Sequence, residues 1–175
     1  MSNEHKKNDF KYQQLSFSLI IISDSRYNQL QKNEKIDDLT IPLVKDLLTK
    51  WKHKLYSVDI IPDEAEFLKR KLRHVIESLK PNIIITSGGT GISKRDITIE
   101  TMLKLFTKEL KGFGELFRYL SYKQIGPTAI LSRATAGIYL DTLIFNLPGS
   151  PKAVELALSK IILKMAPHAM AMLLS

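Results

Sequence analysis

The sequence predicts an α/β protein whose helices cover both faces of a mostly parallel, doubly wound sheet. Two features of the chain support this prediction. Short continuous apolar runs, typical of strands buried on both faces, alternate with longer segments in which apolar residues recur at helical spacing. The 175 residues, of which 44% are hydrophobic and 25% are charged, are also enough for one domain with a buried core. Right-handed crossovers between parallel strands then limit the topology to a doubly wound layer.

Three strands and two helices alternate in the N-terminal half of the chain. The expected strands are the apolar runs at residues 17–22, 55–61 and 83–86. Apolar residues at helical spacing predict helices through residues 43–51 and 67–79, the second of which has the clearest amphipathic pattern in the chain.

The same alternation continues in the C-terminal half. Three helices and a pair of strands are expected there. They are a helix that carries Met102, Leu103 and Phe106, a shorter helical segment at residues 115–120, strands at residues 133–139 and 142–147 with a turn near Leu140 and Asp141, and a last helix that starts at Pro151.

The N-terminus is polar and basic and has no apolar segment of a signal peptide. We therefore expect a flexible polar tail over residues 1–15 and a single domain over residues 16–175. No apolar run approaches the about 20 residues that a membrane span needs, so no membrane is expected as a partner. The absence of cysteine excludes disulfides and thiolate chemistry. A cytoplasmic location is the expectation.

The net charge of +8 raises the question of a nucleic-acid partner. The lysines are spread over the expected helices instead of clustering with aromatic residues on one stripe. The densest run, residues 69–73, is interpreted as a solvated helix face. We therefore expect no nucleic acid as a partner. The four histidines show no spacing typical of a metal pair, and no serine has an evident neighbouring base for a hydrolytic triad.

Polar loops follow four of the expected strands. In a parallel sheet the carboxyl ends of the strands meet at one edge, where ligands of such folds bind. These loops should therefore converge on one site. They are Ser23-Asp24-Ser25-Arg26, Pro62-Asp63-Glu64, residues 86–91 with Lys94, Arg95 and Asp96 shortly after, and residues 146–151.

The loop at residues 87–91, Ser-Gly-Gly-Thr-Gly, has two interpretations. It could be a plain turn. Alternatively, its glycines could let consecutive N–H groups point inward and bind a phosphate at the start of the next helix. The loop lacks the Gly-Lys-Ser/Thr ending of a Walker motif and the spacing of a dinucleotide fingerprint.

Asp63, Asp96 and Arg95 are equally ambiguous from the residues alone. Asp63 stands at the position of a helix cap, with Glu66 as its partner three residues later. Asp96 could favour the start of a helix near Thr98. Either carboxylate could instead bind Mg²⁺ beside a phosphate. Arg95 could contact a phosphate or be solvated.

Residues 86–98 resemble the signature of the MoaB/MogA family of molybdenum-cofactor biosynthesis proteins. The resemblance continues through residues 23–24, 61–64, 112–115, 128–134 and 146–152, and it runs in the family's order from about residue 18 to residue 164. It implies a three-layer α/β/α sandwich, the molybdopterin-binding fold. It also implies a homotrimer, or a hexamer made of two trimers.

The activity that the resemblance implies is adenylylation of molybdopterin, with ATP and molybdopterin as substrates and Mg²⁺ as the cofactor. Asp63 and Asp96 match the acidic positions that catalyse the transfer, through a Mg²⁺ ion that they would bind. The molybdate-inserting enzyme would act downstream as a partner. The positions that match substrate- and nucleotide-binding residues are Ser23, Asp24, Asp38, Ser87, Gly88, Gly89, Thr90, Gly91, Arg95, Pro148, Gly149 and Ser150.

Near Asp38 the chain departs from the family's pattern. Relatives have an acidic residue followed closely by a small Ser or Gly pair, whereas this chain reads Asp38-Leu39-Thr40-Ile41-Pro42 after a polar loop at residues 25–37. Asp38 is interpreted as the matching acid.

Three other functions remain as alternatives. One is a family member that binds molybdopterin without transferring anything to it, against which the presence of Asp63 and Asp96 argues. Another is the molybdate-inserting relative, whose glycine loop resembles Gly-Gly-x-Ser-x-Gly-Asp and which carries further domains. The third is an unrelated nucleotide-binding oxidoreductase, which the spacing of the glycines disfavours.

Overall fold

The computed structural model describes residues 14–175, and most of the expected N-terminal tail lies outside the described residues. Its centre is a six-stranded sheet with the order β2-β1-β3-β6-β5-β4. The neighbouring strands β2, β1, β3 and β6 are parallel to one another, whereas β5 pairs antiparallel with β6 and β4 pairs antiparallel with β5. The strands are β1 (Ser16–Ile22), β2 (Lys54–Ile61), β3 (Ile83–Ser87), β4 (Lys108–Glu109), β5 (Thr135–Tyr139) and β6 (Thr142–Leu147).

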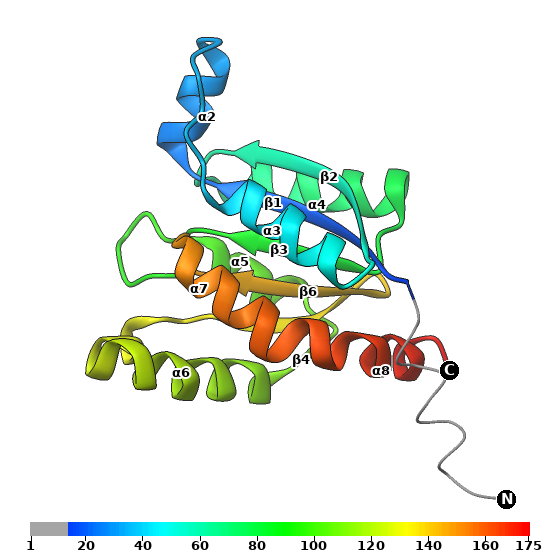
Figure 1. The fold of residues 1–175 in the computed structure, drawn as a ribbon. Coiled ribbons are helices and arrows are strands. Elements are labelled where there is room, and N and C mark those ends of the chain that lie inside the picture. The colour runs from blue at the N-terminus through cyan, green and yellow to red at the C-terminus, as the bar shows by residue number, and fades with distance from the viewer. Residues whose placement is uncertain (1–13) are drawn as a thin grey trace, which may run out of the picture.

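Helices lie on both faces of the sheet, which confirms the predicted three-layer α/β/α sandwich (Figure 1). Alternate strand residues point to opposite faces, so Leu19 and Ile21 enter one core cluster while Ile20 and Ile22 enter the other. The first core packs against α3 (Thr40–Lys50), α6 (Lys111–Ile125) and the C-terminal helix, and the second packs against α4 (Ala65–Leu79) and α5 (Thr98–Leu105).

The C-terminal helix runs without a break through α7 (Pro151–Ala157), the π-helical turn η3 (Leu158–Ile162) and α8 (Leu163–Leu173). By length and composition alone its 23 residues could cross a membrane, which differs from the expectation that no apolar run has that length. Half of its most apolar window is buried inside the protein, where Val154, Leu158 and Ile162 pack in the first core. A core helix of this kind passes the same test of length and composition.

Two helices differ from the sequence predictions. The helix α2 (Asp24–Gln31) was not expected, because none of its side chains is buried and it therefore has no apolar periodicity. The helix α6 begins at Lys111, four residues before the expected start, with Gly112 and Gly114 inside its first turn. Gly114 is needed there because a Cβ atom would lie 2.7 Å from the carbonyl oxygen of Ala134.

The hairpin between β5 and β6 confirms the turn expected near Leu140 and Asp141. Both residues have positive φ angles, 48° and 56°, as a tight two-residue hairpin turn requires. Strand β5 starts at Thr135, two residues later than expected, because the short 3₁₀ helix η2 (Gly126–Leu131) and its exit occupy the preceding residues.

Candidate functional site

The four loops predicted to meet at the carboxyl edge of the parallel strands do meet there. The register pairs Ile22 with Ile61, and Ser87 with Leu147, so the strands end side by side. The loops then bond to one another: the Ser23 N–H donates to the carbonyl oxygen of Ile61 (2.9 Å), and the Gly88 N–H donates to that of Leu147 (3.0 Å). One edge of the sheet therefore carries the candidate site.

Two glycines in the loop at residues 87–91 have no room for a side chain. Gly88 has a φ of 122°, and a Cβ atom there would lie 2.1 Å from the carbonyl oxygen of Ile22. Gly89 has a φ of 64°, and its Cβ atom would lie 2.3 Å from the hydroxyl of Thr98. Thr98, at the start of α5, bonds both carbonyls: its hydroxyl donates to Gly88 (3.0 Å) and its N–H to Gly89 (3.1 Å). The loop is thus fixed against β1 on one side and α5 on the other.

Asp24 and Asp63 lie beside this loop and bond each other's backbone. The Asp63 N–H donates to Asp24 Oδ1 (2.9 Å), and the Asp24 N–H donates to Asp63 Oδ2 (3.3 Å). Asp63 does not cap α4, whose N-cap is Glu64 with no side-chain cap bond, so the helix-cap interpretation of Asp63 is wrong. The reason is that the turn after β2 directs the Asp63 carboxylate toward the first strand's loop instead of back along the helix.

The charges of Asp96 and Arg95 both act on the pKa of Asp63. The pKa of Asp63 is raised, mainly by burial and also by repulsion from the carboxylates of Asp24 and Asp96. The N–H of Asp24 and the charge of Arg95 oppose that rise. Three carboxylates and one guanidinium therefore share this site.

Asp96 closes a turn beyond the glycine loop. Its Oδ2 accepts from the Ser93 N–H (2.7 Å), and its own N–H donates to the carbonyl oxygen of Ser93 (3.0 Å). The N-cap of α5 is Ile97, without a side-chain cap bond, so Asp96 is not the capping residue. A Cβ atom on Gly91 would lie 2.9 Å from Asp96 Oδ2, so the absence of a side chain at Gly91 leaves room for this carboxylate.

Asp38 lies apart from these three carboxylates, in a different set of bonds. Its Oδ1 accepts from the N–H groups of Thr40 (2.7 Å) and Ile41 (2.8 Å) at the start of α3, and its Oδ2 pairs with Arg26 Nε (2.8 Å). Its side chain is 2% exposed. Asp38 therefore holds α2 against the start of α3.

The loop after β6 packs against the glycine loop. The Ser87 hydroxyl donates to the carbonyl oxygen of Pro148 (3.3 Å), and a Cβ atom on Gly149 would lie 3.6 Å from the Cα atom of Gly88. The Ser150 hydroxyl accepts from the Ala153 N–H (3.2 Å) and caps α7, just as the Ser23 hydroxyl caps α2.

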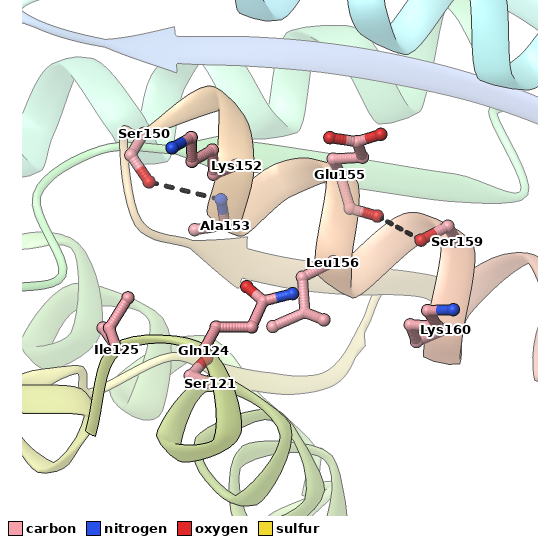
Figure 2. Close-up of a pocket in the computed structure, with 10 residues that line it drawn as sticks. All are labelled: Ser121, Gln124, Ile125, Ser150, Lys152, Ala153, Glu155, Leu156, Ser159 and Lys160. Atoms are coloured by element: carbon pink, nitrogen blue, oxygen red, sulfur yellow. Dashed lines mark hydrogen bonds between the residues drawn. The ribbon is translucent and has the colours of Figure 1, made fainter. Parts of the chain in front are cut away.

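A cavity of about 620 Å³ opens on the other side of Ser150. Its walls come from α6 and from the first three turns of the C-terminal helix, with Gln124 on one side and Lys152 and Lys160 on the other (Figure 2). Ser150 is the only predicted site residue that lines it, and none of the three carboxylates does. The cavity is therefore adjacent to the carboxylates through the loop after β6 without containing them.

The carboxylates leave oxygens available for a cation. Each of Asp24, Asp63 and Asp96 has one oxygen in the hydrogen bonds given above, and no bond to a residue in 14–175 uses the other oxygen. No group of three or more acidic or histidine side chains within residues 14–175 forms a metal cage. Mg²⁺ does not require such a cage, because proteins often hold it by one or two carboxylates while substrate phosphates and water complete its shell, and the remaining oxygens of these carboxylates fit that kind of site.

Thr98 and Arg133 are site residues that the sequence analysis did not single out. Arg133 reaches the glycine loop from the segment before β5: its Nε donates to the carbonyl oxygen of Gly91 (2.8 Å) and its backbone N–H to that of Thr90 (3.2 Å). Both residues stand in the motifs at residues 86–98 and 128–134, but no pattern of residues in the sequence reveals the contacts that Thr98 makes within its own motif or that Arg133 makes with a motif about 40 positions earlier.

Comparison with known proteins identifies the family. A family model described as "Probable molybdopterin binding domain" matches residues 18–168. A protein of Methanocaldococcus jannaschii named probable molybdopterin adenylyltransferase is 41% identical over 154 residues, which are 88% of this chain and 91% of that protein. The molybdenum cofactor biosynthesis protein B of Bacillus subtilis is 40% identical over 151 residues, which are 86% and 85% of the two chains.

Solved structures agree with these sequence matches. A crystal structure of a molybdenum cofactor biosynthesis protein B superposes with a TM-score of 0.83 at 35% identity, over 93% of this chain and 97% of the other. The tungsten cofactor synthesizing protein MoaB of Pyrococcus furiosus superposes with a TM-score of 0.81 at 36% identity, over 93% and 99% of the chains.

Proposed function

This chain belongs to the MoaB/MogA family of molybdopterin-binding proteins, and from that premise we propose that it is a nucleotidyltransferase that adenylylates molybdopterin in molybdenum cofactor biosynthesis. The observation that carries the proposal is the meeting of a glycine loop with the carboxylates of Asp24, Asp63 and Asp96 at one edge of the sheet. The relative from Methanocaldococcus jannaschii bears the name of this activity.

The reaction forms one bond and breaks another at the α-phosphorus of ATP. An oxygen of the terminal phosphate of molybdopterin attacks that phosphorus, and the bond from the phosphorus to the bridging oxygen of pyrophosphate breaks. The products are adenylylated molybdopterin and pyrophosphate. Transfers of this type ask a protein mainly to position two anions and to balance their charge.

The residues of the site divide that work. The N–H groups of Gly89, Thr90 and Gly91 bind phosphate oxygens at the start of α5, while Ser87 and Gly88 hold the beginning of the loop against the end of β6. Arg95, which is exposed beside them, adds a positive charge. The loop of Pro148, Gly149 and Ser150 forms the neighbouring wall and leads into the 620 Å³ cavity, which we assign to the remainder of the substrates.

Asp63 and Asp96 are the residues that we assign to catalysis, with Asp24 beside them. When bound, Mg²⁺ supplies positive charge that neutralises the phosphates and makes the α-phosphorus more electrophilic. The burial of Asp63 and its repulsion by Asp24 and Asp96 support this assignment, because a cation relieves both costs. Ser23 and Asp38 support the site indirectly, since their side chains cap α2 and bond the start of α3.

An assembly of three or six copies is part of the proposal, and exposed apolar side chains on α6 and η2 support it. Such a patch is unusual on a monomer and typical of an interface. The large apolar residues of the patch, each at least 44% exposed, are Leu116, Tyr119, Tyr122, Ile125, Ile130 and Leu131.

We also propose that residues 16–175 form a single cytoplasmic domain, and that the enzyme that inserts molybdate consumes the product.

The experiment that tests the function is product analysis under anaerobic conditions. Purified protein is mixed with molybdopterin, Mg²⁺ and ATP labelled at the α-phosphorus. We expect the label to move to the pterin and one pyrophosphate to appear for each labelled pterin. Molybdopterin binding without transfer would instead identify a binding-only member of the family. Omission of Mg²⁺ should stop the transfer, and transfer at an unchanged rate with a chelator present would remove Mg²⁺ from the mechanism.

A further inference from the structure

Arg133 bonds the last two residues of the glycine loop. Its backbone N–H donates to the carbonyl oxygen of Thr90 (3.2 Å) and its Nε to that of Gly91 (2.8 Å). One of its terminal nitrogens also donates to the carbonyl oxygen of Asp96 (3.4 Å). A single residue, from a segment about 40 positions later in the chain, therefore connects the backbone of Gly91 to the backbone of Asp96.

The segment that Arg133 spans is otherwise held by hydrogen bonds within itself, between Ser93 and the residues Arg95 and Asp96. Residues 92–95 are exposed and belong to no helix or strand. Within the segment, the Asp96 carboxylate is set against the Gly91 backbone, because a Cβ atom there would lie 2.9 Å from Asp96 Oδ2. A shift of the Gly91 carbonyl therefore moves the surface on which the Asp96 carboxylate rests.

The guanidinium of Arg133 is held from its other side by Glu100. The Glu100 carboxylate pairs with both terminal nitrogens of Arg133, and this bond lowers the pKa of Glu100. Glu100 lies in the first turn of α5, the helix whose Thr98 bonds Gly88 and Gly89. The planar fork of arginine can serve three acceptors at fixed angles, which the single ammonium of lysine cannot do.

We propose that Arg133 is a positioning residue for the adenylyl transfer: its guanidinium fixes the Asp96 carboxylate relative to the glycine loop. This inference rests on the proposed function of the site. None of the hydrogen bonds or ion pairs of Arg133 involves Asp63, and it acts on the substrates only through the backbone of Gly91 and Asp96. Its loss should therefore disturb the geometry of the transfer more than the binding of the substrates.

The chain offers a matched control in Arg118. Its guanidinium donates to the carbonyl oxygens of Ser132 (3.5 Å) and Ala134 (3.2 Å), the two neighbours of Arg133, and it has no bond to the glycine loop. Arg133→Lys and Arg118→Lys thus remove arginine contacts from the same segment, but only the first removes the contacts to Gly91 and Asp96. Glu100→Gln is a third variant, exposed at the surface, that leaves Arg133 in place and weakens its anchor.

The first measurement is hydrogen exchange of the protein without substrates. In Arg133→Lys we expect amides of residues 90–97, including that of Ser93, to exchange about tenfold faster than in the wild type, because the turn that Asp96 closes opens more often. Arg118→Lys should leave these rates unchanged, and Glu100→Gln should raise them by a smaller factor. Unchanged rates over residues 90–97 in Arg133→Lys would overturn the proposal. If Arg133→Lys does not fold, the rates in Glu100→Gln decide in the same way.

The second measurement separates positioning from binding. We expect kcat of Arg133→Lys to fall about 10- to 100-fold, since a misplacement on the order of 1 Å costs that much, while KM for ATP changes less than about threefold. An equal loss in Arg118→Lys would assign the effect to the whole segment and contradict the role of the guanidinium. If the wild type transfers nothing, the proposed function fails, and the exchange rates alone decide whether Arg133 holds Asp96.

Discussion

At the scale of single residues, Asp63 is a carboxylate whose charged form is disfavoured by its surroundings. It is half-buried, it faces two other carboxylates, and its pKa is raised, yet a backbone N–H and the nearby Arg95 keep its charged form accessible. A residue in such balance responds strongly to an added cation or to the loss of a neighbouring charge. The arrangement is costly for a surface loop and is reasonable where a ligand supplies the missing positive charge.

A side chain at Gly88 should destabilise the protein. Gly88→Ala should lower the free energy of unfolding by at least about 2 kcal/mol for two reasons. Alanine rarely adopts the φ of 122° that this position requires, and its Cβ atom would lie 2.1 Å from the Ile22 carbonyl oxygen. Gly112→Ala is the control, since nothing lies within 4 Å of a Cβ atom there and the site is helical. It should change stability by no more than about 1 kcal/mol, in the stabilising direction. Urea unfolding monitors both variants, and equal stabilities would contradict the clash.

Some residues of the site could be found from the sequence alone and others could not. The carboxylates and glycines could be found because each stands at a strand end beside a recognisable motif. Arg133 could not be found in this way, because its role depends on three acceptors that only the folded chain brings together. For Asp63 the sequence left a helix cap and a Mg²⁺ ligand as alternatives, because spacing alone does not show which way the turn after β2 points.

At the scale of elements, apolar content decided what could be predicted. Strands β1, β3 and β6 are continuous apolar runs buried on both faces, and all three were expected close to their observed bounds. Helix α2 has no buried residue, so its pattern contains no period to detect. It depends on the Ser23 cap, the pair of Arg26 with Asp38, and the ring contact of Tyr27 with Phe67.

At the scale of elements, His53 beside strands β1 and β2 should make the stability of the fold depend on pH. His53, just before β2, packs its ring on Phe17 with centroids 5.4 Å apart, and its Nδ1 accepts the Leu15 N–H (3.2 Å). Burial lowers the pKa of His53 from its usual value. The folded state therefore favours the neutral ring, and protonation would turn the acceptor Nδ1 into a donor facing another donor.

The direction in which pH changes stability follows from the number of protons that the folded and unfolded states bind. Below pH 6.5 the unfolded chain protonates His53 more readily than the folded chain, so stability is complete above pH 6.5 and falls as the pH drops toward the lowered pKa. His53→Gln should flatten this part of the curve. Urea midpoints between pH 7.5 and pH 5.5 give the comparison. A slope that persists in His53→Gln would rule out His53 as its cause.

At the scale of the whole molecule, the sheet topology places the function. The order β2-β1-β3-β6 puts four strand ends side by side, so residues from positions 23, 63, 96 and 149 come together although the chain separates them widely. The alternation of elements was sufficient to predict this convergence. The cavity between α6 and the C-terminal helix was not predictable, because it depends on how far apart two packed helices stand.

The central claim is that this edge of the sheet transfers an adenylyl group with the help of Asp63 and Asp96. The most direct test compares kcat for the transfer in the wild type, Asp63→Asn, Asp96→Asn and Asp46→Asn, the last of which removes an exposed carboxylate on α3 far from the motifs. Matching thermal unfolding curves would confirm that all four proteins are folded. We predict a loss of at least about 100-fold in the first two variants and a change of less than about twofold in Asp46→Asn. Transfer at the wild-type rate in both Asp63→Asn and Asp96→Asn would contradict the account.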